Sequence, residues 1–148
     1  MRAAPSRTCG DCSLCCKIMG VKQIDKPRNV WCRHCDVGVG CRIYEERPQT
    51  CRDYDCRYLI DPRLPEAWRP TTAKMVVNKD PTRVVIQVDP HRPDAWRREP
   101  YYSTIKQWAR AARPGWPVFV CIGERTIAVY PDREKDVQMP PDAELGAA

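Results

Sequence analysis

Nine of the ten cysteines in this chain fall in its N-terminal third, between Cys9 and Cys56, and the first four form the run Cys-x-x-Cys-x-x-Cys-Cys. The cysteines of this segment are Cys9, Cys12, Cys15, Cys16, Cys32, Cys35, Cys41, Cys51 and Cys56. Large aliphatic side chains are few here, and a segment with so little apolar area usually needs disulfides or a bound metal to fold. Sulfur chemistry therefore decides how this third of the chain is stabilised.

The sequence favours metal-bound thiolates over disulfides. It has no apolar stretch near the ~18 residues that indicate a membrane span. Its first residues, MRAAPSRTCGDC, lack the apolar run of a secretory signal. We therefore expect a cytoplasmic protein, in a reducing compartment where lasting disulfides are rare. Clustered cysteines in such a compartment most often bind a metal or take part in catalysis, and this spacing favours metal.

Two Cys-x-x-Cys units, Cys9/Cys12 and Cys32/Cys35, support the metal hypothesis. Such a unit lets two thiolates reach one ion, and four sulfurs in a tetrahedron satisfy Zn²⁺. Thiolates also hold iron–sulfur clusters, so ligand type alone does not separate zinc from iron. All nine cysteines are candidate ligands, which slightly exceeds two four-sulfur sites. The two adjacent cysteines that end the first run are expected to serve different centres, or one of them only to pack.

Charged and polar residues close to the cysteines are candidates to contact the sulfurs. His34 lies inside the second Cys-x-x-Cys unit, where a hydrogen bond to a sulfur is the expected role and direct ligation the alternative. Arg47 and Arg52 lie near Cys51, and their charges lower the electrostatic cost of a zinc ion with four thiolates, which has a net charge of about −2. For Arg47 an ion pair with a nearby carboxylate is the alternative.

The motif CxxCxxCC at 9–16, followed by GCxIYxxRPxxCR at 40–52, resembles the YkgJ-like cysteine-cluster family of bacterial proteins, which carry a zinc- or iron-chelating domain. The matching residues are Cys9, Cys12, Cys15, Cys16, Cys35, Cys41, Ile43, Tyr44, Arg47, Pro48, Cys51 and Arg52. The match spans 9–58, and Cys32 and Cys56 are additional to it. The resemblance implies metal chelation without naming a reaction, and it adds Tyr44 to the residues expected around the sulfurs.

The rest of the chain predicts a small α+β unit at 71–131, packed on the cysteine-cluster module at 9–58. Two apolar runs at 74–78 and 84–89 flank a turn-forming stretch and indicate a hairpin, and the runs at 118–123 and 126–130 indicate a second. These runs are apolar at nearly every position, so we expect strands covered on both faces.

A helix is expected between the hairpins, starting near Pro100, because apolar residues recur there with helical spacing. The predicted fold class is therefore α+β, a metal-stabilised cysteine-rich module followed by a small antiparallel β-β-α-β-β sheet with one packed helix. The Pro-rich connector at 61–70 is expected to be irregular. Residues 1–8 and 132–148 are expected to be flexible tails.

Charge argues against nucleic-acid binding, because the net charge of +6 is spread evenly along the chain and forms no basic stretch. Lys106, Arg110 and Arg113 occupy the polar side of the predicted helix. A solvated helix face is the preferred interpretation of these residues, and a stripe that contacts phosphate is the alternative. Cys121 lies within an apolar strand and is expected to be buried as a small apolar side chain.

The leading hypothesis is a zinc-binding protein with one or two thiolate sites in a mainly structural role, with catalysis not expected. An iron–sulfur protein with a redox or methylase-type activity is the first alternative. A zinc-containing module that binds nucleic acid is the second. A protein partner is compatible with the leading hypothesis, and no membrane association is expected.

Overall fold

The computed structural model describes residues 12–49, 51, 56–78 and 83–138, and within them the chain forms a mixed α+β fold with two sheets. The predicted α+β class is confirmed at this level. The predicted tail at 1–8 lies outside the described residues. In the part that is described, no helix is long and apolar enough to cross a bilayer.

Short elements joined by turns make up the cysteine-rich segment. They are α1 (Cys15–Ile18), η1 (Lys22–Ile24), β1 (Cys35–Asp36), β2 (Gly40–Cys41) and η2 (Tyr44–Glu46). The strands β1 and β2 form a two-stranded antiparallel sheet in which Cys35 lies opposite Cys41. Gly38 turns the chain between them with a φ of 80°, a conformation that residues with a side chain rarely adopt. This hairpin therefore fixes the separation of two cysteines.

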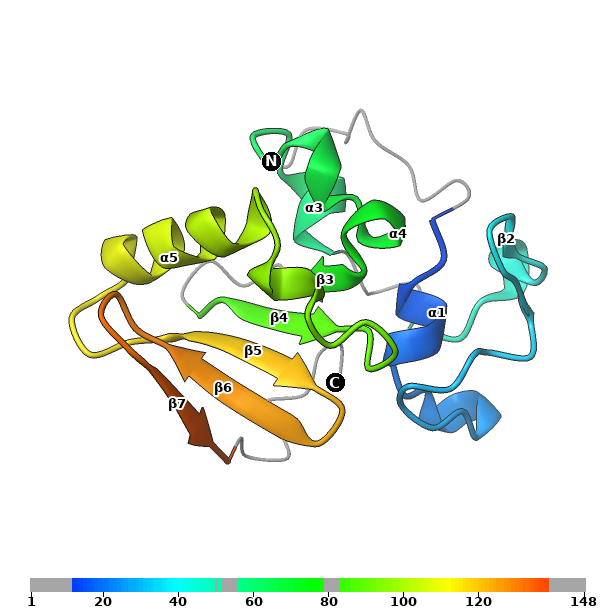
Figure 1. The fold of residues 1–148 in the computed structure, drawn as a ribbon. Helices are drawn as coiled ribbons and strands as arrows, with labels where there is room; N and C mark the ends of the chain where they lie inside the picture. The colour runs from blue at the N-terminus through cyan, green and yellow to red at the C-terminus, as the bar shows by residue number, and fades with distance from the viewer. Residues whose placement is uncertain (1–11, 50, 52–55, 79–82, 139–148) are drawn as a thin grey trace.

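A five-stranded sheet in the order β3-β4-β5-β6-β7 forms the second part of the molecule (Figure 1). Its strands are β3 (Met75–Val77), β4 (Val85–Val88), β5 (Val118–Ile122), β6 (Arg125–Val129) and β7 (Glu134–Val137). The two predicted hairpins are confirmed as the antiparallel pairs β3/β4 and β5/β6. The prediction of a purely antiparallel sheet is wrong, because β4 and β5 pair in parallel. The helix between them returns the chain to the end of the sheet where β4 begins, and a crossover of this kind makes the next strand parallel.

That helix, predicted from its apolar spacing, is confirmed as α5 (Tyr101–Ala111). Tyr101, Ile105 and Ala109 recur at i, i+4 and i+8 and are buried, whereas Arg110 is exposed. The buried face packs on β5 and β6, and Figure 1 shows α5 lying along the sheet. The helix ends at Ala111, and its C-cap residue Ala112 has an extended backbone.

Strand β7 corrects the prediction that 132–148 form a flexible tail, because it pairs antiparallel with β6. Residues 139–148 lie outside the described residues. The carboxylate of Glu134 accepts a hydrogen bond from Arg97 at 2.9 Å and another from the Tyr102 hydroxyl at 2.7 Å. The acidic residues of this segment, which suggested disorder, therefore include Glu134 as a hydrogen-bond partner for groups on the neighbouring elements.

The predicted irregular connector contains helical turns. The remaining helical elements are α3 (Arg57–Ile60), η3 (Glu66–Trp68), α4 (Pro70–Ala73) and η4 (Ala95–Arg97). Pro70 opens α4 at a position where a missing N–H costs little. Trp68 is 1% exposed, and its ring lies 5.0 Å from the ring centroids of both Tyr101 and Trp108. The connector thus contributes a side chain to the centre of the core.

A buried ion pair joins the cysteine-rich segment to the sheet. The ammonium of Lys17, on α1, lies 2.7 Å from the carboxylate of Asp89 at the end of β4, and the two side chains are 6% and 9% exposed. The same ammonium donates to Nδ1 of His91 at 2.6 Å and lies 5.6 Å from the ring centroid of Trp31. Lys17 is therefore surrounded by groups that offset the cost of burying its charge.

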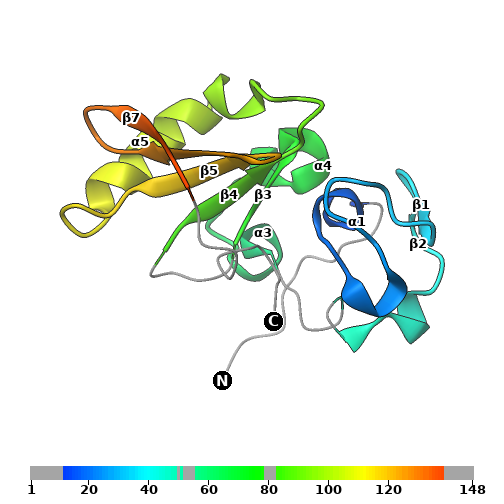
Figure 2. The same ribbon diagram turned by 90° about the horizontal axis from the view of Figure 1, so that it is seen from below.

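An apolar contact lies beside this ion pair. Leu14 and Ile18 pack against Val76 of β3, and all three side chains are buried. Figures 1 and 2 both show α1 next to the β3–β4 side of the sheet. This single helical turn and its N-cap residue Leu14 therefore supply both a buried ion pair and an apolar contact between the cysteine-rich segment and the sheet.

Replacing Asp89 with Asn should destabilise the protein, because the Lys17 ammonium then stays buried without its ion-pair partner. Loss of one member of a buried pair typically costs about 3–5 kcal/mol in the free energy of unfolding. Urea unfolding near neutral pH would measure it. The exposed Asp132, which pairs with Arg133 at 3.2 Å, gives the control: Asp132→Asn should change stability by less than about 1 kcal/mol.

The effect should also depend on pH. Burial raises the pKa of Asp89, but hydrogen bonds from Lys17 and from the backbone N–H of His91 outweigh it and hold the pKa below its usual value. The stabilisation is therefore complete above the unfolded pKa of about 3.9 and is lost as the pH falls through the lower folded-state pKa. The stability difference between wild type and Asp89→Asn should shrink in that acidic range. A difference that stays constant down to acid unfolding would contradict the ion-pair interpretation.

Candidate metal centre

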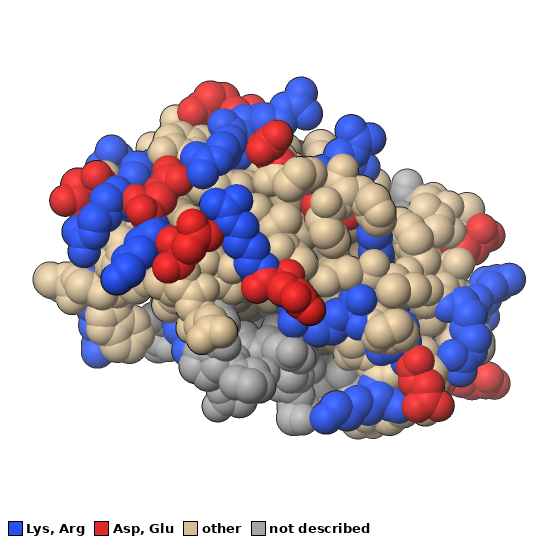
Figure 3. Space-filling model, turned by 60° about the horizontal axis from the view of Figure 1, so that its bottom comes forward, with Lys and Arg blue, Asp and Glu red and all other residues tan. Residues whose placement is uncertain are grey.

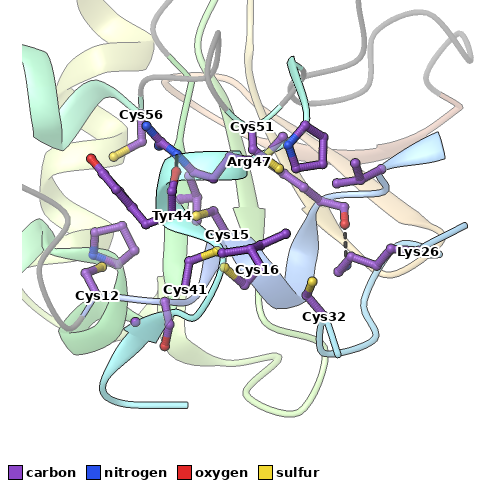
Figure 4. Close-up of a pocket in the computed structure, with 18 of the residues that line it drawn as sticks. Cys12, Cys15, Cys16, Lys26, Cys32, Cys41, Tyr44, Arg47, Cys51 and Cys56 are labelled. Atoms are coloured by element: carbon purple, nitrogen blue, oxygen red, sulfur yellow. Dashed lines mark hydrogen bonds between the residues drawn. The ribbon is translucent and has the colours of Figure 1, made fainter. Parts of the chain in front are cut away.

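Seven of the predicted ligand cysteines line one cavity. They are Cys12, Cys15, Cys16, Cys32, Cys41, Cys51 and Cys56. The cavity has a volume of about 110 Å³, against the ~10–15 Å³ that one water molecule needs by the same kind of measure. In the view of Figure 4, Cys12 and Cys56 lie toward one side of the cavity and Cys32 toward the other. The space is therefore large enough for several atoms and is bordered by sulfur on more than one side.

Local backbone structure brings these cysteines together from separate stretches of the chain. The N–H of Cys32 donates to the carbonyl of Cys16 at 3.0 Å and holds the second Cys-x-x-Cys unit against α1. Cys41 is held by the β1–β2 hairpin. Cys56 precedes α3 as its N-cap residue and packs against the apolar clusters of both parts of the molecule. The positions of these sulfurs are thus set by elements that pack on one another.

The adjacent residues Cys15 and Cys16 both line this cavity. The expectation that they serve different centres, or that one of them only packs, stays a prediction. A hydrogen bond from the Cys15 thiol is the largest cause that lowers the pKa of Cys16, to about 6. Burial opposes this shift, while a hydrogen bond with Cys35 and the charge of Lys26 support it. At neutral pH Cys16 is therefore a thiolate, the form that binds metals and reacts with electrophiles.

Cys35 is not among the residues that line the cavity, but it forms a hydrogen bond with Cys16. Burial and the negative charge of Cys16 raise the pKa of Cys35 to about 12. Cys35 therefore remains a thiol and donates to the Cys16 sulfur. The eight described members of the predicted ligand set are thus divided: seven border the cavity, and Cys35 contacts it through Cys16.

Lys26 borders the thiol cavity and was not among the predicted site residues. Its side chain is buried, and its ammonium donates to the backbone carbonyls of Lys17 and Pro27, each at 2.9 Å, and to that of Met19. Burial lowers the pKa of Lys26, and the nearby sulfurs, Cys32 first, oppose this shift. The three carbonyls hold the positively charged ammonium of Lys26 beside the sulfurs. No signal in the sequence distinguishes this lysine from a solvent-exposed one.

Arg47 and Tyr44, both predicted around the sulfurs, also line the cavity. The Arg47 guanidinium lies 3.8 Å from the ring centroid of Tyr44, and its Nε donates to the Tyr44 carbonyl at 2.9 Å. Burial, and after it the neighbouring cysteines, raises the pKa of Cys51, and the positive charge of Arg47 opposes this shift. The aromatic ring and the backbone therefore hold a second cation at the cavity.

The remaining predicted residues have different outcomes. The backbone N–H of His34 donates to the sulfur of Cys32 at 3.4 Å, so this residue contacts a sulfur through its backbone. Cys9 and Arg52 lie outside the described residues. Cys121 is buried in β5, as expected of a small apolar side chain, and burial raises the pKa of its thiol.

The sulfurs of the described cysteines line the cavity but do not converge on one point where a metal ion could bind. Among the described residues, no group of three or more His, Cys, Asp or Glu side chains could hold a metal ion as it stands. None of the described cysteines forms a disulfide. The chemistry of the donors fits a soft metal, since seven thiols share the cavity with two cations. To bind one metal ion, the cysteine side chains would have to turn toward a common point.

Comparison of the chain with protein-family models, with curated proteins and with solved structures found no match. The resemblance to the YkgJ-like family therefore stays a prediction from the motif residues of the sequence.

The pKa difference between Cys16 and Cys35 can be tested by alkylation of the metal-free protein. Near pH 7, iodoacetamide should modify Cys16 at least about tenfold faster than Cys35, because only a thiolate attacks. The rate at Cys16 should rise through pH 6 and then level off. Peptide mass spectrometry after timed quenching would measure both rates. Cys121 serves as the unreactive control, and equal rates at Cys16 and Cys35 would contradict the assignment.

Proposed function

We propose that this chain is a metal-binding protein in which thiolates of the cysteine-rich segment bind zinc, in one or two sites, in a mainly structural role. The observation that supports this best is the convergence of seven cysteines from separate stretches of the chain on one cavity of about 110 Å³. Sulfur is a preferred ligand of Zn²⁺, and closed four-sulfur sites stabilise folds without catalysing reactions.

The charges around the cavity support thiolate ligation. A metal ion with four thiolates has a net charge of about −2 when the ion is Zn²⁺, and burying that charge is costly without nearby cations. Lys26 and Arg47 both line the cavity. Lys26 is held in place by three backbone carbonyls, so its charge cannot move away from the sulfurs.

A structural role follows from how little apolar packing the segment has. Its buried cluster consists of Leu14 and Ile18 against one strand residue, and Val30, Val37 and Val39 are all more than half exposed. Small modules of this composition commonly draw their folding free energy from a bound metal. Four of the cavity cysteines would hold a single metal ion. Two ions would need eight ligands, which the cavity cysteines supply together with Cys9 and Cys35.

An iron–sulfur cluster is the second candidate, favoured by one observation. The cavity has room for several atoms, and more than four sulfurs border it. In that case the protein would be a redox protein or an enzyme, and methylase-type chemistry belongs to this candidate. Zinc is preferred because the cavity cysteines are numerous enough for a four-sulfur site, and such a site needs no substrate.

Nucleic-acid binding is not supported by the surface. Basic and acidic side chains are interspersed over the face that Figure 3 shows, without a continuous basic area. Phosphate binding by a nucleic-acid module usually uses a basic patch or stripe. A cytoplasmic location agrees with the proposal, since a reducing compartment keeps the thiols available for metal.

Zinc removal should destabilise the protein. Because metal binding is coupled to the folding of such a segment, a high-affinity chelator should lower the melting temperature of the zinc-loaded chain by several degrees or more. Cys16→Ser should lose zinc and show the reduced melting temperature without chelator. Zinc content by elemental mass spectrometry and melting by circular dichroism would measure both.

Cys121→Ala is the matched control, because Cys121 is a cysteine in the sheet, remote from the cavity. It should keep the zinc content and chelator sensitivity of the wild type. If Cys16→Ser kept full zinc and its melting temperature, Cys16 would not be a ligand. If chelator changed neither protein, the structural role of the metal would be refuted.

A further inference from the structure

A second cavity shares no lining residue with the thiol cavity, although its Arg57 and Val77 are sequence neighbours of residues that line the thiol cavity. It has a volume of about 390 Å³ and lies between the end of α5, the start of α3 and the residues that lead into β4 and β5. Pockets for small molecules typically span about 300–1,000 Å³. This cavity is therefore of a size that suits a small ligand, and it belongs to no part of the proposed metal centre.

Three arginines line the cavity, and among the described residues no carboxylate does. They are Arg57, Arg83 and Arg113. Nε of Arg57 donates to the carbonyl of Asn78 at 3.1 Å, which fixes that side chain at the wall. Within the described residues, neither Arg83 nor Arg113 forms an ion pair with a carboxylate, although Arg83 is half-buried. Arg83 and Arg113 thus bring two positive charges to the cavity that no described carboxylate pairs with, and such charges favour an anionic occupant.

Asn78 also fixes the backbone that carries Arg83. Its side-chain amide donates to the Arg83 carbonyl at 2.7 Å, and its side-chain oxygen accepts from the N–H of Val85 at 2.9 Å. Arg57 and Arg83 are therefore tied to the same residue on the edge of the sheet. Positioning of this kind reduces the conformational entropy that the arginines would lose on binding an anion.

Two tryptophans form the aromatic part of the cavity wall. Trp108, on α5, is backed by the buried ring of Trp68 at 5.0 Å between centroids. Trp116 is 44% exposed, and the Arg113 guanidinium lies 5.5 Å from its ring centroid. Valine, alanine and proline side chains complete the lining. A flat ring could therefore contact aromatic and apolar atoms while an attached anionic group reaches the arginines.

A purely structural explanation accounts for only part of this arrangement. Arg113 directly follows the C-cap residue of α5, where a cation interacts favourably with the partial negative charge of the helix end. The end of α5 does not explain the positions of Arg57 and Arg83, which come from other parts of the chain. It also leaves the exposed ring of Trp116 beside an open cavity unexplained.

We propose that this cavity binds a small organic anion that joins a flat ring to a phosphate or carboxylate group. The arginines, with Arg83 and Arg113 foremost, bind the anionic group by charge-assisted hydrogen bonds. Trp116 and Trp108 contact the ring. This assigns a second ligand site to the chain, and it holds whether or not the thiol cavity binds metal.

Calorimetric titration of the full-length protein with three matched probes tests the proposal. Naphthyl phosphate carries both parts of the expected ligand, naphthol carries only the ring and inorganic phosphate only the anion. Naphthyl phosphate should bind at least about tenfold tighter than either of the others. Equal binding of naphthol would reduce the site to an apolar cavity and overturn the proposal. Naphthoate then shows whether phosphate or carboxylate is preferred, and either preference supports the assignment.

Single substitutions locate the binding. Arg83→Gln and Arg113→Gln should each weaken naphthyl phosphate binding about tenfold, since each removes a charge-assisted contact. Arg110→Gln is the control, because Arg110 is an exposed arginine on the same helix that does not line the cavity. Circular dichroism would establish that each variant is folded. Wild-type affinity in both Arg83→Gln and Arg113→Gln, or no saturable binding of naphthyl phosphate and naphthoate at millimolar concentrations, would overturn the proposal.

Discussion

The buried contact between Lys17 and Asp89 determines how the two parts of this protein meet. Lys17 lies directly after Cys15 and Cys16 on a helix of a single turn, so the ion pair that fixes α1 on the sheet also fixes the sulfurs of two cavity cysteines. The carbonyl of Lys17 accepts one of the hydrogen bonds that hold the Lys26 ammonium at the cavity. A helix this short has little stability of its own. Its position therefore depends on the ion pair and on the packing of Leu14 and Ile18 against Val76.

Charge balance is the second constraint on the cavity. Several sulfurs in one place cannot all be thiolates without compensation, and the lowered pKa of Cys16 beside the raised pKa of Cys35 illustrates this. Lys26 and Arg47 supply fixed positive charge, and a bound metal ion would supply the rest. In the account proposed here, the metal replaces the protons on the remaining thiols. This explains how one cavity can carry so many cysteines when the described residues of its lining include two cations.

The repeating patterns of the sequence predicted the parts of the fold that depend on local apolar spacing. The helix from Tyr101 and both hairpins follow such patterns, and the structure confirms them. The parallel pairing of β4 with β5 depends on where α5 returns the chain, and β7 depends on Glu134 meeting partners far along the chain, so local patterns could not indicate either. Similarly, cysteine spacing indicated which residues converge, but Lys26 acquires its role only through three carbonyls brought together by the fold.

The central claim is that the thiol cavity is a metal centre, and the most direct test is the metal content of the untagged protein, purified without oxygen and without added metal. Elemental mass spectrometry should find one or two zinc ions per chain. Iron together with a matching amount of acid-labile sulfide would contradict zinc and assign the cavity to an iron–sulfur cluster. A chain free of both metals, and unable to take up zinc after reduction, would contradict the account as a whole.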